Sequence, residues 1–237
     1  MSLRLNISDV RKNYNGKPVL NACSFSFDRN GVYVLTGSNG SGKSTLLRIC
    51  ALIESPDNGE VNYFSGDTPL HPPLPRGELK GGVSSEGNVL NKDIELRRRI
   101  TLVLPGIGLF NTTVFNNAAY GLKIRGGKNK ETERKVNDAL NFVGLIHKKN
   151  HNALTLSSGE TQRLGIARAM VIEPEMLFLD EPTASIDNEN TEIVENIILN
   201  MKKEGRSKII IATHDMMQAK RLADCMLLMD EGKIIKV

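Results

Sequence analysis

The nine residues from Gly37 to Thr45, which read GSNGSGKST, constrain the fold more than any other stretch of the chain. They match the phosphate-loop pattern G-x-x-x-x-G-K-[ST], in which a strand runs into a glycine-rich bend that opens a helix. Glycine lets the bend curl until successive N–H groups point inward, and a Cβ at Gly40 or Gly42 would hinder this. The apolar run at 32–35 supplies the expected strand, and residues 46–49, which read LLRI, have the character of the expected helix. The stretch therefore predicts an α/β fold with an anion-binding turn.

Individual side chains of this loop have expected roles. Lys43 adds a point charge for the β- and γ-phosphates of a nucleotide, and the Ser44 hydroxyl can ligate Mg²⁺. The helix that starts near Ser44 directs the positive end of its dipole at the anion. The alternative is a glycine- and serine-rich turn before an ordinary helix, which the flanking pattern disfavours. The candidate nucleotide-binding residues are Gly37, Ser38, Asn39, Gly40, Ser41, Gly42, Lys43, Ser44 and Thr45.

The composition narrows the class of protein. A length of 237 residues allows one large α/β domain or a core domain with a smaller lobe. Aromatic residues make up 5% of the chain and tryptophan is absent, which disfavours a base-stacking surface for nucleic acid. The net charge of +4 is carried by dispersed basic residues rather than by a stripe. We therefore expect no nucleic-acid partner.

Cysteine usage and hydropathy indicate the compartment. Cys23, Cys50 and Cys225 lie far apart without metal-ligand spacing, so reduced thiols in a cytosolic protein are expected. The first ten residues have no long apolar region, and no run of about 18 apolar residues occurs in the sequence. The sequence therefore predicts a cytoplasmic protein without a membrane span of its own.

The first third of the chain reads as an antiparallel β lobe. Apolar and polar residues alternate at 3–7 and again at 19–27. Asn15-Gly16 supplies a turn, and Asn30-Gly31 predicts a hairpin turn into the strand that feeds the phosphate loop. Tyr14 precedes the second strand and has two readings, a tyrosine in a surface turn or a ring that stacks on adenine.

The middle of the chain predicts a long loop and then a mainly helical lobe. Residues 65–91 are rich in glycine, proline and serine, and His71 within them has no partner at ligand spacing. After a strand at 100–104, a short helix is expected within 109–122, capped by Asn111 or Thr112. An amphipathic helix follows at 132–143.

A second helix N-terminus that can bind an anion is predicted at residues 156–163, which read LSSGETQR. Ser157 and Glu160 have the spacing of a capping box, so a helix begins here and is expected to run to Glu173-Pro174. Free backbone N–H groups at its start can bind an anion. Helix capping alone explains Ser157 and Glu160 but not the adjacent Gly159.

Acidic and histidine side chains follow two apolar strands. The strand at 176–179 ends in Asp180 and Glu181, where ligands bind in open parallel sheets. Asp180 can hold Mg²⁺ opposite Ser44, and Glu181 can polarise an attacking water. Asp187 or Asn188 caps the next helix. His214 follows the strand at 207–213 and is either an ordinary capping or core residue or a contact to the γ-phosphate.

With these pieces in order, the chain resembles the nucleotide-binding subunit of an ATP-binding-cassette transporter over essentially its whole length. Tyr14 matches the adenine-stacking position, and Asp180 and Glu181 match the Mg²⁺ and catalytic-carboxylate positions. Residues 184–187, which end in Asp187, match the loop that follows them, and His214 matches the switch histidine. The family signature is matched by Leu156, Ser157, Ser158, Gly159 and Glu160, with Ser158 in place of a usual glycine.

The resemblance implies a phosphate-loop NTPase core with an N-terminal antiparallel β lobe and a smaller helical lobe. Residues 1–237 would form one such domain, with the core and β lobe at about 1–99 and 157–237 and the helical lobe at about 100–156. It also implies the cofactors ATP and Mg²⁺ and an ATP-dependent, head-to-tail homodimer. Hydrolysis would drive a membrane permease from the cytoplasmic face and, indirectly, serve a solute-binding protein.

Two features bear on activity and substrate. The family carries a glutamine after the strand at 100–104, and this chain has Pro105, which lacks a side-chain amide and a backbone N–H. Hydrolysis of ATP is expected to persist through Glu181 and His214. The alternatives to a transport ATPase are a nucleotide-gated module with little turnover and a soluble, non-transport member of the superfamily. The segments LFNTTV and NNAAYGL, within 109–122, look similar to importer subunits for oxyanions such as phosphate, tungstate and molybdate.

Overall fold

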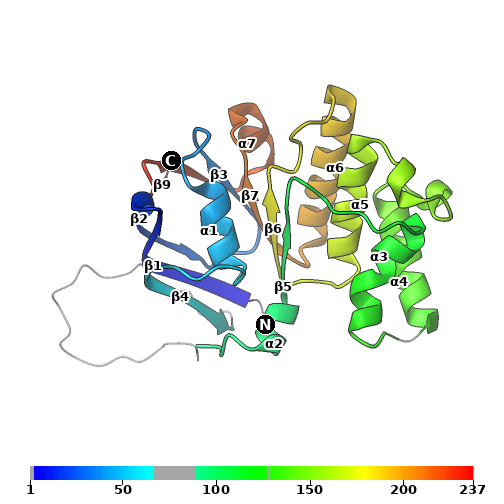
Figure 1. Ribbon diagram of the computed structural model, residues 1–237, viewed down its shortest axis with the longest axis horizontal. Coiled ribbons are helices and arrows are strands. Elements are labelled where there is room, and N and C mark those ends of the chain that lie inside the picture. The colour runs from blue at the N-terminus through cyan, green and yellow to red at the C-terminus, as the bar shows by residue number, and fades with distance from the viewer. Residues whose placement is uncertain (1–2, 67–88, 128, 237) are drawn as a thin grey trace.

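Two β-sheets organise the chain in the computed structural model, which describes residues 3–66, 89–127 and 129–236 (Figure 1). The smaller sheet is antiparallel, with strand order β2-β1-β4. Its strands are β1 (Leu3–Tyr14), β2 (Lys17–Phe27) and β4 (Asn58–Ser65). The antiparallel β lobe predicted from the alternating residues is therefore confirmed. Most of the predicted loop at 65–91, His71 included, lies outside the described residues.

The larger sheet has six strands in the order β5-β6-β7-β3-β8-β9, and every neighbouring pair is parallel except β8 with β9. Its strands are β3 (Val32–Thr36), β5 (Ile100–Val103), β6 (Met176–Asp180), β7 (Lys208–Ala212), β8 (Cys225–Asp230) and β9 (Lys233–Lys236). In β3, Val34 pairs with Ile211 of β7 and Met226 of β8. The strand that feeds the phosphate loop is thus held from both edges, and the predicted α/β class is confirmed.

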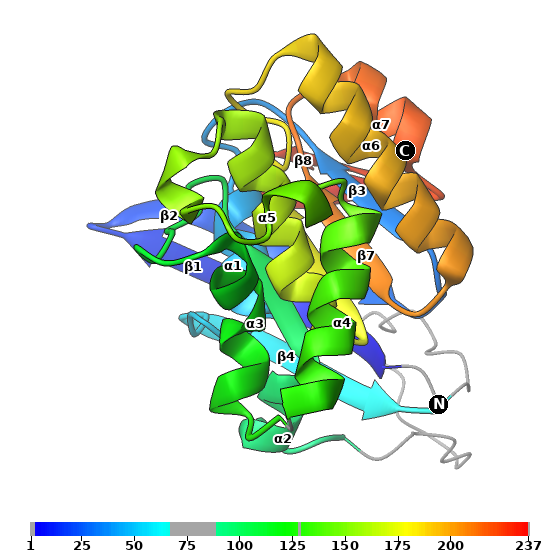
Figure 2. The ribbon, with the colours of Figure 1, turned by 90° about the vertical axis from the view of Figure 1, so that its right-hand side faces the viewer.

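Helices cover both faces of this sheet. The helices are α1 (Lys43–Cys50), α2 (Ile94–Arg98), α3 (Val114–Ile124), α4 (Asn129–Phe142), α5 (Ser158–Met170), α6 (Asn188–Glu204) and α7 (Met216–Leu222). Short 3-10 turns at Ile146–Lys148 and Ala153–Thr155 join α4 to α5. Figure 2 shows α3, α4 and α5 side by side, with α6 and α7 beyond them.

The two faces of the larger sheet belong to two separate cores. Ile209 and Ile211 pack with α3 to α7 in one core, whereas Ile210 packs with α1 and the smaller sheet in the other. This alternation follows from the period of two along a strand. As a result, α1 and α5 lie on opposite sides of the sheet, as Figure 1 also shows. Lys208 ties the two sheets together, since its Nζ donates to the carbonyls of Leu3 (3.0 Å) and Phe27 (2.7 Å).

Three sequence predictions are corrected. Asn30-Gly31 is not a hairpin turn, because β2 and β3 lie in different sheets and the edges of β3 are taken by β7 and β8. The cap of α3 is Thr113, whose hydroxyl accepts from Asn116 N at 3.1 Å, and not Asn111 or Thr112. Residues 100–103 form β5 of the six-stranded sheet and so lie in the core rather than in the helical lobe.

No helix in the described ranges has both the length and the apolar character that crossing a membrane requires.

Candidate functional site

The phosphate loop lies between β3 and α1, and its lysine is held by the loop itself. Lys43 is buried, and its Nζ donates to the carbonyls of Gly37 at 2.8 Å and Ser38 at 3.0 Å. The ammonium therefore stands inside the bend, where an anion would meet it. The hydroxyl of Ser41 is buried without a hydrogen-bond partner within the described structure, so it is available to hydrogen-bond a ligand.

Glycine is required in this loop partly for reasons other than phosphate access. A Cβ at Gly42, where φ is 101°, would lie 2.8 Å from the carbonyl oxygen of Val19. A Cβ at Gly37, where φ is 146°, would lie 2.3 Å from that of Met229. The obstacle at Gly42 is thus neighbouring backbone, which corrects the sequence argument. At Gly40 the space is open and only the φ of 83° favours glycine.

Ser44 and Asp180 come together as predicted, although they are 136 residues apart. The hydroxyl of Ser44, at the start of α1, donates to Asp180 Oδ1 at 2.8 Å. Burial at the end of β6 raises the pKa of Asp180, and the hydrogen bond from Ser44 opposes this. Two hard oxygen ligands suit Mg²⁺, which usually takes one or two protein oxygens together with substrate phosphates. In the described ranges, no three His, Cys, Asp or Glu side chains cluster around a metal position.

Glu181 and His214 also meet, at the adjacent carboxyl ends of β6 and β7. His214 Nδ1 lies 3.0 Å from Glu181 Oε2. The φ of Glu181 is +48°, and its backbone N–H donates to the carbonyl of Ala212 at 2.9 Å. A non-glycine residue in the left-handed region is strained, and such strain is found at functional positions.

Tyr14 lies at the end of β1, beside the phosphate loop. Its hydroxyl donates to Glu54 Oε1 at 2.5 Å, and the side chain of Thr45 is close enough to bond the phenol as well. Burial and the hydrogen bond to Glu54 raise the pKa of Tyr14. The Nζ of Lys12 lies 5.6 Å from the ring centroid, so a cation covers one face of the ring. Tyr14 is 40% exposed, which leaves surface for a flat partner.

The start of α5 has the predicted capping box. Ser157 Oγ accepts from Glu160 N at 3.3 Å, and Glu160 Oε2 accepts from Ser157 N at 3.0 Å. Glu160 also pairs with Lys148 at 2.5 Å. Ser157 and Ser158 are exposed, so the amino end of the helix faces outward. Leu156 packs at the edge of the core behind it.

The loop after β6 ends at Asp187, and the structure selects Asp187 over Asn188 as the cap of α6. Asp187 Oδ1 accepts from Asn190 N at 2.8 Å. Asp187 also comes close to the start of α5, because Asn190 packs against the backbone of Gly159.

The predicted residues therefore form two groups. One contains the phosphate loop, Tyr14, the two carboxylates and His214, and the other contains Asp187 and the start of α5.

Comparison with known proteins decides the family. Residues 20–184 match the family model described as "ABC transporter". The chain belongs to the ABC transporter family.

Relatives extend this match to nearly the whole chain. The tungstate uptake system ATP-binding protein TupC of Peptoclostridium acidaminophilum is 34% identical over 232 residues, or 98% of this chain and 97% of the relative. The phosphate import ATP-binding protein PstB 2 of Natronomonas pharaonis is 32% identical over 243 residues, or 98% and 78%. The solved structure of cbiO1 from Clostridium perfringens, part of the ABC transporter complex cbiONQ, has a TM-score of 0.79 at 28% identity, covering 99% of this chain and 88% of that one. The chain is an ATP-binding and ATP-hydrolysing subunit of an ABC importer.

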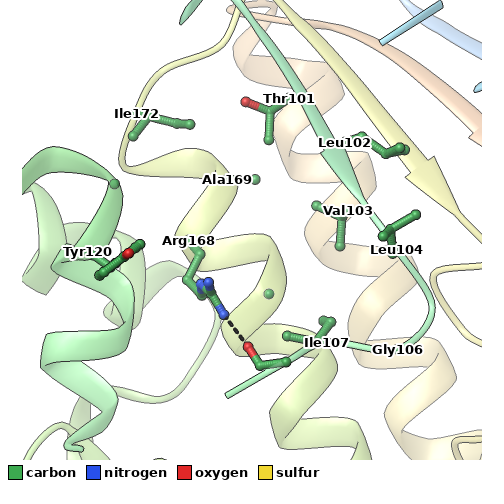
Figure 3. Close-up of a pocket in the computed structure, with 13 residues that line it drawn as sticks. Thr101, Leu102, Val103, Leu104, Gly106, Ile107, Tyr120, Arg168, Ala169 and Ile172 are labelled. Carbon is green, nitrogen blue, oxygen red and sulfur yellow. Dashed lines mark hydrogen bonds between the residues drawn. The ribbon is translucent and has the colours of Figure 1, made fainter. Parts of the chain in front are cut away.

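A groove of about 340 Å³ adjoins the loop that follows β5 in this ABC subunit (Figure 3). Leu104, Ile107 and Tyr120 line it, and Arg168 of α5 reaches across it to donate to the carbonyl of Gly108 at 2.6 Å. Burial lowers the pKa of Arg168, which is the only charged residue among the groove's lining residues in the described chain.

Several residues that shape these sites belong to no sequence motif. Lys12 and Glu54 hold Tyr14, Asn190 joins α6 to the start of α5, and Arg168 organises the groove. None belongs to the phosphate-loop or carboxylate patterns, and each acts across a tertiary contact.

Proposed function

We propose that this ABC subunit works as a head-to-tail homodimer in which each ATP is held by the phosphate loop of one copy and the start of α5 of the other. The proposal rests on the placement of two helix N-termini that can bind an anion. They are the start of α1 at Lys43 and the start of α5 at Ser158, and they lie on opposite faces of one sheet. A single γ-phosphate can meet both ends only if they come from different copies. Closure of the pair would then depend on ATP, and hydrolysis would release it.

Within such a site each side chain has a distinct task. Lys43 neutralises the β- and γ-phosphates, and Ser44 and Asp180 hold Mg²⁺, which offsets negative charge on the transferring phosphoryl group. Glu181 accepts a proton from the attacking water. His214, 3.0 Å from Glu181, orients that carboxylate and reaches the γ-phosphate. Tyr14 stacks on adenine with its free face, since Lys12 covers the other.

The groove beside β5 is the surface that suits the membrane subunit. Leu104 and Tyr120 are 38% and 43% exposed there, and Phe110 stacks on Tyr120 with ring centroids 4.4 Å apart. An apolar segment of a permease would cover this surface, and Arg168 would receive a polar group from it. Such a contact would hold the chain at the cytoplasmic face of a membrane, with the solute-binding protein on the far side.

The solute best supported is an oxyanion. Relatives that cover nearly the whole chain are the ATP-binding proteins of a tungstate uptake system and of phosphate import. To test this, the chain is reconstituted in vesicles with its permease and solute-binding protein, and uptake of tungstate, molybdate, phosphate and methionine is compared. ATP-dependent uptake of an oxyanion supports the proposal, and uptake of methionine alone contradicts it.

Pairing itself is tested on the purified chain. The ATPase activity per copy should rise with protein concentration, because monomers lack half of each site. Sedimentation should show a dimer only with ATP. Constant specific activity from a species that stays monomeric would contradict the dimer.

Replacing Pro105 with glutamine should raise the Mg²⁺-dependent ATPase rate about three- to tenfold. A side-chain amide there can hydrogen-bond a metal-bound water, and such outer groups commonly change activity by about 10–100-fold. Pro105 is exposed and follows β5, so the substitution disturbs no core packing. Pro105→Ala is the matched control, since it removes the ring without adding an amide. Equal rates for the two variants would show that the missing amide is compensated elsewhere.

A further inference from the structure

Asn190 joins the loop that ends at Asp187 to the start of α5. It lies in the first turn of α6, and its side-chain Nδ2 donates to both carboxylate oxygens of Asp187, at 3.1 and 2.9 Å. Its backbone N–H donates to Asp187 Oδ1 at 2.8 Å. Three hydrogen bonds from one residue therefore fix the orientation of the Asp187 carboxylate.

The other side of Asn190 packs on the start of α5. A Cβ built at Gly159 would lie 2.2 Å from Asn190 Cγ and 2.3 Å from its Oδ1. A side chain at position 159 would have to displace Asn190, whose amide therefore rests directly on the Gly159 backbone. This contact accounts for Gly159, which helix capping does not explain.

The chemistry of the amide suits this place between a carboxylate and a helix end. An amide donates to both oxygens of Asp187 without adding charge. A carboxylate at position 190 would repel Asp187, and an aliphatic side chain would leave its oxygens without these donors. Because the hydrogen bonds from Asn190 favour the ionised form, they lower the pKa of Asp187.

We propose that Asn190 is a positioning residue of the ATPase, which locks Asp187 and the amino end of α5 into one unit that meets the ATP of the other copy. The inference rests on the proposed head-to-tail dimer. Within that dimer both segments approach the same nucleotide, so an error in their relative position weakens ATP capture more than it slows chemistry.

The local lock is tested first on the nucleotide-free chain. Asn190→Ala should speed amide hydrogen exchange at 158–161 and 187–190 at least about fivefold, with exchange unchanged at the phosphate loop. Asn141→Ala, an exposed asparagine on α4, is the matched control and should change neither region. Unchanged exchange in Asn190→Ala would overturn the lock, whatever the state of the dimer.

The functional role is tested by kinetics and pH. Asn190→Ala should raise KM for ATP about five- to tenfold and lower kcat less than twofold. Asn190→Asp should lose activity at pH 8 and regain part of it relative to the wild type only as the pH falls toward about 5, where one shared proton relieves the repulsion from Asp187. Faster exchange with an unchanged KM and a wild-type pH profile would overturn the positioning role. Absence of an ATP-dependent dimer in the wild type would instead contradict the proposed function, and the exchange result would still stand.

Discussion

Replacing Glu181 with glutamine is expected to lower the ATPase rate about 10²- to 10⁴-fold while ATP still binds. Glutamine keeps the size of the side chain and can still hydrogen-bond His214, which lies 3.0 Å from the carboxylate. It cannot take a proton from water, and general-base catalysis contributes a factor of this order. Phosphate release measures the rate, and ATP titration measures the affinity.

The Glu181→Gln variant should accumulate as an ATP-bound dimer, since separation of the two copies depends on hydrolysis. Glu133→Gln, at an exposed position of α4, is the control and should keep the wild-type rate. This comparison also decides between an ATPase and a nucleotide-gated module with little turnover, the alternative that Pro105 raises. Equal rates for the wild type and Glu181→Gln would remove Glu181 from the chemistry.

Replacing Lys43 with alanine should weaken ATP binding about 10- to 150-fold. A hydrogen bond to a charged group contributes about 1.5–3 kcal/mol, and this lysine is the only ammonium held inside the phosphate loop in the described structure. The carbonyls of Gly37 and Ser38 would also lose their donor, so the nucleotide-free loop should become more mobile.

Calorimetric titration with ATP measures the loss of affinity. Lys130→Ala, an exposed lysine on α4, is the matched control for the removal of one positive charge. A dissociation constant within about twofold of the wild type would mean that the loop amides hold the phosphates without the lysine.

Local patterns predicted most of the first site. The phosphate loop and the acidic pair after β6 are short motifs whose geometry depends on neighbouring residues, as is the capping box at Ser157 in the second group. Parallel strands then bring their carboxyl ends to one edge, so the meeting of Ser44 with Asp180 and of Glu181 with His214 followed from strand order.

Contacts between elements were not predictable in the same way. Asn30-Gly31 has the composition of a hairpin turn, but the partners of β3 come from β7 and β8, far along the chain. Asn190 and Gly159 belong to different helices, and only their packing shows why the glycine is needed. The groove likewise depends on how α5 meets the loop after β5.

The shared site can be tested by mixing two inactive variants. Lys43→Ala disables the phosphate loop, and Ser158→Asp places a negative charge at the exposed start of α5, where it would repel the γ-phosphate. Each variant alone should have almost no ATPase activity. In an equal mixture, half of the dimers contain one of each, and every mixed dimer has one intact site out of two, so activity should return to about a quarter of the wild-type value. A mixture as inactive as its components would mean that ATP is held within a single copy.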